Sequence, residues 1–162
     1  MTLPSLLRIA LITALFASAA AAQKYTGPVP PKPDVPYLVH ADNLLETEAS
    51  QAKEDDRGKE ILYSVEGASS AVRTPLAEPI FLIETQKVVA EKLELYKFEI
   101  KRGRREVLLV KNPGKNSPRP IRIVVKKVGD RLYHIEADET LENGEYGLSP
   151  AGSNQVFCFQ VY

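Results

Sequence analysis

Residues 93 to 111 read LELYKFEIKRGRREVLLVK, and this stretch decides the fold. Its first half alternates, with Tyr96, Phe98 and Ile100 on one face and charged residues on the other, which is typical of a strand. The segment RGR then leads into a second apolar run, REVLLVK. The two runs therefore predict an antiparallel hairpin.

The same pattern recurs on both sides of this hairpin. The run IRIVVKKV turns at Gly129 and Asp130 into RLYHIEAD, and EYGLS is joined by the turn PAGSN to QVFCFQVY. Upstream, ILYSV and IFLIE are short runs of branched and aromatic residues bounded by glycine or proline. With no long helical pattern, these runs predict an all-β fold, an antiparallel sandwich of about seven to nine strands.

The last of these runs, QVFCFQVY, ends in Tyr162. Its stronger apolar alternation is Phe157, Phe159 and Val161, so we expect these three side chains in the core. A strand that spans a membrane needs roughly 9 to 11 residues, and most runs here are shorter. We therefore expect a protein that does not span a membrane.

The amino-terminal segment predicts export. Residues 1 to 22 contain one cation, a short apolar run and small residues that satisfy A-x-A at Ala20 and Ala22. Cleavage is expected near Gln23. The single cysteine, Cys158, is not at the cleavage site, so no lipid anchor is expected there. These features predict a periplasmic or extracellular protein.

The mature chain divides into two parts in this interpretation. Residues 23 to 59 contain five prolines, which predict an extended arm. The charged stretch from Leu44 to Glu60 follows them, and we expect it to be a solvated loop or a short surface helix. The β-sandwich domain is expected over residues 60 to 162.

One short motif sharpens the predicted fold. The segment LENGEY, Leu141 to Tyr146, resembles the L-x-x-G-x-Y tyrosine corner of fibronectin type III and immunoglobulin-like sandwiches. The resemblance implies an Ig-like sandwich in which the Tyr146 hydroxyl bonds to nearby backbone. The chain lacks the tryptophan and the cysteine pair of immunoglobulin domains. Asn143 and Gly144 alone also fit a tight hairpin turn.

A second resemblance concerns the compartment. The segments EGASSAVRTPLAEPIF and GEY are loosely similar to segments of uncharacterised secreted bacterial proteins. This similarity implies no particular activity.

The residues available for catalysis predict a protein that is not an enzyme. His40 and His134 lack the spacing of zinc ligands, and no G-x-S-x-G or phosphate-binding glycine loop is present. Cys158, between two phenylalanines, fits an apolar filler better than a nucleophile. We expect no metal and no cofactor. A small secreted hydrolase with a site not visible in the sequence is the alternative.

Charge is segregated along a chain whose net charge is zero. Residues 97 to 131 contain twelve lysines and arginines against three acids, whereas residues 34 to 66 contain nine acids and three bases. After Arg131 there are five acids and no base. The basic stretch could attract anions, or the acidic segments could neutralise it within the fold.

The candidate binding residues lie in two places. Lys101, Arg102, Arg104 and Arg105 crowd one hairpin turn, and Arg73 lies in a loop with glycine and two serines that could present its guanidinium to a carboxylate or phosphate. Nucleic acid is not expected as a partner of an exported protein. The sequence predicts a non-catalytic binding or assembly module of unknown ligand, and the candidate ligands are an anionic envelope polymer such as a polysaccharide or an acidic protein partner.

Overall fold

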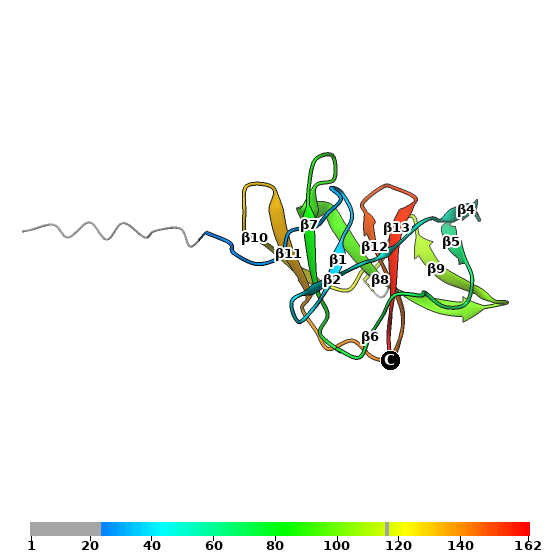
Figure 1. Ribbon diagram of the computed structural model, residues 1–162. Helices are drawn as coiled ribbons and strands as arrows, with labels where there is room; N and C mark the ends of the chain where they lie inside the picture. Colours follow the sequence, from blue (N-terminus) through cyan, green and yellow to red (C-terminus); the bar gives the residue numbers. More distant parts are fainter. Residues whose placement is uncertain (1–23, 116) are drawn as a thin grey trace, which may run out of the picture.

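The computed structural model describes residues 24–115 and 117–162 (Figure 1). The predicted signal peptide lies outside these residues. The described chain is an all-β sandwich of a five-stranded and an eight-stranded sheet, as expected from the sequence. It contains thirteen strands, more than the predicted seven to nine. The helical element in this part of the chain is one 3₁₀ turn, η1 (Ala90–Lys92).

The five-stranded sheet contains the predicted second hairpin, β10 with β11. Its strands, in spatial order, are β10 (Ile123–Lys127), β11 (Leu132–Ala137), β7 (Ile80–Glu84), β1 (Tyr37–His40) and β2 (Asn43–Glu46).

The eight-stranded sheet contains the other two predicted hairpins, β8 with β9 and β12 with β13. Its order is β3 (Glu48–Gln51), β13 (Gln155–Val161), β12 (Gly144–Pro150), β8 (Leu93–Lys101), β9 (Arg104–Val110), β5 (Glu60–Glu66) and β4 (Lys53–Asp56). A short β6 (Arg73–Thr74) runs parallel to β13.

The eight-stranded sheet is rolled on itself. Strands β3 and β4 are separated only by Ala52, yet they pair with strands at opposite ends of the sheet, β13 and β5. One continuous segment therefore brings the two ends together, and the sheet encloses an interior of its own. This rolled interior is distinct from the layer between the two sheets.

The prediction for residues 44 to 60 was wrong, because the segment from residue 37 to residue 56 forms four strands rather than an arm followed by a loop or short helix. Tyr37 and Leu38 are buried in the fold. Strand β4 reads KEDD and is exposed throughout. Its position depends on backbone pairing with β5, and such pairing leaves no hydrophobic alternation in the sequence.

The main core lies between the two sheets. Phe157, Phe159 and Val161 are buried there, as predicted, and Phe159 contacts Phe81 of the opposite sheet with ring centroids 4.8 Å apart. A second, smaller core fills the rolled interior and comprises Val65, Phe98, Val156 and Cys158. The eight-stranded sheet is therefore apolar on both faces.

Strand β8 illustrates these two faces. Leu93 and Leu95 point into the main core, whereas Phe98 belongs to the core of the rolled interior. The predicted alternation of Tyr96 and Phe98 is present, but Ile100 remains about half exposed.

The segment LENGEY forms the predicted hydrogen bond. The Tyr146 hydroxyl donates to the Glu142 carbonyl at 2.7 Å, and its buried ring stacks on Phe159 with centroids 5.6 Å apart. Gly144 begins β12, which follows a connection from β11 in the other sheet. The segment is therefore a connection between sheets with a tyrosine bond, not a hairpin turn.

Candidate functional site

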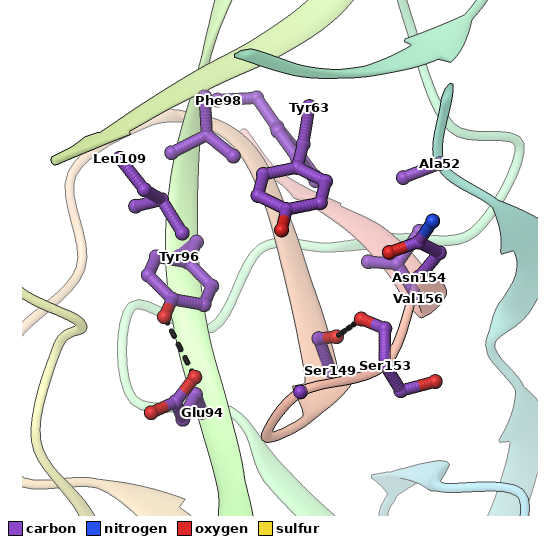
Figure 2. Close-up of a pocket in the computed structure, with 12 residues that line it drawn as sticks. Ala52, Tyr63, Glu94, Tyr96, Phe98, Leu109, Ser149, Ser153, Asn154 and Val156 are labelled. Atoms are coloured by element: carbon purple, nitrogen blue, oxygen red, sulfur yellow. Dashed lines mark hydrogen bonds between the residues drawn. The ribbon is translucent and has the colours of Figure 1, made fainter. Parts of the chain in front are cut away.

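A pocket of about 80 Å³ opens at one end of the rolled interior (Figure 2). Strands β5, β8 and β9 form one wall, and the β12–β13 turn with Ala52 forms the other. The lining residues are Ala52, Tyr63, Glu94, Tyr96, Phe98, Val107, Leu109, Ser149, Gly152, Ser153, Asn154 and Val156.

The floor of the pocket is fixed by the smaller core. Phe98 and Val156 pack over Gly147, where a Cβ atom would lie 2.5 Å from Val156 Cγ2 and 2.8 Å from the Phe98 ring. Only glycine lets the two side chains approach the β12 backbone this closely. The floor is therefore apolar and preformed.

Two tyrosines and a glutamate form one side of the rim. The Tyr96 hydroxyl donates to Glu94 Oε2 at 2.7 Å, as Figure 2 shows. Burial, and then the neighbouring Glu94 carboxylate, raise the pKa of Tyr96 well above its ordinary value. Burial also raises the pKa of Tyr63, with a smaller contribution from Glu54. Both phenols are therefore neutral at physiological pH.

The opposite side of the rim is a tight turn. The Ser149 hydroxyl donates to the Gln155 carbonyl at 2.7 Å and lies 3.3 Å from the Ser153 carbonyl. Ala52 N–H donates to the Asn154 carbonyl at 2.8 Å, which ties the β3–β4 segment to this turn. The Asn154 side chain is exposed at the mouth of the pocket.

The basic residues selected from the sequence are not all brought together. Lys101, Arg102 and Arg104 surround a separate hollow of about 410 Å³, which Arg57 and Glu106 also line. Arg73 lies on β6, with its guanidinium carbon 4.3 Å from the centroid of the Tyr162 ring.

Arg105 points into the rolled interior and is only 1% exposed. Its guanidinium makes a two-pronged contact with Glu48, at 2.7 and 3.1 Å. It also donates to the carbonyls of Glu66 and Gly67, at 2.9 and 3.1 Å. The protein's own groups thus occupy the donors that an external anion would need.

Ion pairs within the protein neutralise most of the cations of the basic stretch, residues 97 to 131. Eight of its twelve cations form ion pairs with carboxylates of the described chain. These eight are Lys97, Lys101, Arg104, Arg105, Lys111, Arg122, Lys126 and Arg131. Glu48 and Asp56 come from the acidic amino-terminal segment, and Glu136, Asp138 and Glu142 from the acidic carboxy-terminal one.

Residues 24–115 and 117–162 contain no group of three or more His, Cys, Asp and Glu side chains that could hold a metal ion. No helix among them is long and apolar enough to cross a membrane. Cys158 is fully buried, and burial raises the pKa of its thiol to about 12, so the thiol is protonated at neutral pH.

The chain was compared with protein-family models, with curated proteins and with solved structures, and none of these comparisons found a match. The site must therefore be interpreted from its own geometry.

Sequence reasoning did not find the pocket. One signal was present: β8 is apolar on both faces, with Leu93 and Leu95 on one and Tyr96 and Phe98 on the other. Such a strand has a second surface to cover, which indicates an additional cluster or a ligand site. Ala52 and Asn154 carried no such signal.

Proposed function

We propose that the protein is an exported, non-catalytic binding module and that the pocket of the rolled sheet is its ligand site. The observation that carries this proposal is a preformed apolar floor beneath a rim of convergent polar groups, the usual construction of a small-molecule site. Export to the periplasm or the cell exterior belongs to the same proposal, and the amino-terminal segment supports it.

The state of the nucleophiles supports binding rather than catalysis. A hydrolase would need a serine or cysteine activated by a neighbouring base. In the pocket, the Ser149 hydroxyl donates to a backbone carbonyl, and the Ser153 hydroxyl oxygen accepts from the Gln155 backbone N–H. Cys158 lies in the core beneath with a raised pKa.

The hollow at the β8–β9 turn supports a second candidate function. Four cations, Arg57, Lys101, Arg102 and Arg104, line it with one acid, Glu106, around the apolar Leu62 and Leu108. Arg102 stands at the tip of the turn with φ +52°. We propose this hollow as a contact for an acidic protein partner or an anionic polysaccharide.

Ligand titration followed by amide NMR tests the pocket. Four probes cover the main chemistries: phenol, acetate, choline and neohexyl alcohol, the uncharged carbon analogue of choline. We expect at least one probe to shift the amides that line the pocket. The substitution Asn154→Trp places an indole at the mouth and should abolish those shifts.

The matched control is Asn43→Trp, an exposed position on β2 of the other sheet. It should leave the titration unchanged. Shifts that persist in Asn154→Trp, or no shifts with any probe, would contradict the assignment of the pocket.

A further inference from the structure

We propose that the pocket selects an organic cation, an alkylammonium or quaternary ammonium head carried on an apolar body. This inference rests on the pocket being the ligand site and adds the chemical class of the ligand.

Aromatic side chains form one wall of the pocket. Tyr63 of β5 and Tyr96 and Phe98 of β8 line the same small pocket. Figure 2 shows the Tyr63 and Tyr96 rings along the pocket, with the Glu94 carboxylate next to the Tyr96 hydroxyl. The faces of aromatic rings carry partial negative charge and attract cations, and quaternary ammonium groups are commonly held by such walls.

The pocket lining also carries a negative charge. Glu94 is its only ionisable carboxylate, and no Lys or Arg lines the pocket. Only one Glu94 oxygen, Oε2, accepts from Tyr96. Glu54 is the β-pairing partner of Tyr63 and adds a second negative charge near that phenol. Because both phenols are neutral, the lining presents one full negative charge within an aromatic surface.

Within the described residues, neither of two nearby cations forms an ion pair with Glu94. Lys111 lies near enough to Tyr63 to lower the pKa of its phenol slightly. Lys111 is itself paired with Asp56, and its Nζ atom lies 2.6 Å from Asp56 Oδ2. Arg119 lines an adjoining hollow that shares Glu94, Tyr96 and Leu109 with the pocket. It would therefore face the part of a ligand that extends outside the pocket.

Size restricts the ligand further. A volume of about 80 Å³ has room for about five to eight water molecules, at roughly 10 to 15 Å³ each. A methylated ammonium head or the end of a lysine side chain fits this space. A folded peptide does not.

The test compares choline with neohexyl alcohol, which has the same shape without the charge, by amide NMR titration of the folded protein. We expect choline to bind about tenfold more tightly, the size of a partly desolvated cation–aromatic contact. Glu94→Gln should remove most of this preference. Glu91→Gln, an exposed carboxylate outside the pocket, is the matched control and should retain it.

A second variant separates the contribution of the aromatic ring from that of the Glu94 charge. Tyr63→Leu keeps apolar bulk in the wall and should weaken choline binding while leaving neohexyl alcohol binding nearly unchanged. Equal affinities for the two probes in the pocket would overturn the cation inference and leave the proposed binding function standing. If none of the four probes shifts the pocket amides, both fail. A choline preference that Glu94→Gln and Tyr63→Leu leave intact would also overturn the inference.

Discussion

Replacing Arg105 tests whether the interior ion pair holds the rolled sheet together. The substitution Arg105→Gln removes a buried cation and leaves Glu48 without its partner and two carbonyls without their donor. Removing one member of a buried pair costs about 3 to 5 kcal/mol. The Glu48 side chain is 29% exposed, so water offsets part of this cost, and we expect a loss of about 2 to 4 kcal/mol in the free energy of unfolding.

Urea unfolding of four proteins measures the effect: the wild type, Arg105→Gln, Glu48→Gln and the double variant. The sum of the two single-variant losses in unfolding free energy should exceed the loss of the double variant. The difference is the coupling energy, about 1 to 3 kcal/mol. Arg102→Gln, in the exposed turn, is the control and should change stability by less than about 0.5 kcal/mol. A loss below about 1 kcal/mol for Arg105→Gln, or zero coupling, would refute the reasoning.

The same pair predicts a pH dependence. Burial raises the pKa of Glu48, but the hydrogen bonds and positive charge of Arg105, with a smaller contribution from Ser50, lower it more, so the net pKa lies below the ordinary value of 4.5. The folded protein therefore binds this proton less readily than the unfolded chain. The stabilisation is complete at neutral pH and is lost as the pH falls from about 4.5 through the lower, folded pKa. Glu48→Gln should flatten this part of the curve of unfolding free energy against pH, measured by urea unfolding at a series of pH values.

Three further predictions concern other parts of the chain. Tyr146→Phe should cost about 0.5 to 1.5 kcal/mol for the lost hydrogen bond, and Tyr146→Ala several times that, in chemical denaturation; equal and negligible losses would contradict the corner assignment. The exported protein should begin at or near Gln23 by intact-mass measurement, and retention of residues 1 to 22 would disprove export with cleavage. The double substitution Arg102→Gln and Arg104→Gln should leave folding intact and weaken salt-dependent retention on heparin, whereas unchanged retention would exclude this turn as an anion site.

Local signals explain what the sequence could predict. The three hairpins join neighbouring strands through short connections, so alternation and turn residues were sufficient to find them. The bond of Tyr146 spans only four residues and follows from a six-residue motif. Export remains a prediction, because residues 1 to 22 lie outside the described structure.

Long-range pairing explains what the sequence did not reveal. Strands β3 and β4 are polar, and their positions depend on β13 and β5 rather than on any pattern of their own. The burial and pairing of Arg105 depend on the same long-range contacts, because its partner Glu48 belongs to β3. Four cations crowded in one turn looked equivalent in the sequence, and strand alternation turned one of them inward.

The single segment that closes the rolled sheet also has a dynamic consequence. Residues 53 to 56 are all exposed and are held mainly by backbone pairing with β5, so they lack the apolar burial that resists local opening. Their amides should therefore exchange with solvent hydrogen sooner than those of β12. Ala52 directly precedes this segment and lines the pocket, so each local opening of residues 53 to 56 would widen the pocket entrance. The strand pairing that closes the sheet around the cavity would then also open to admit a ligand.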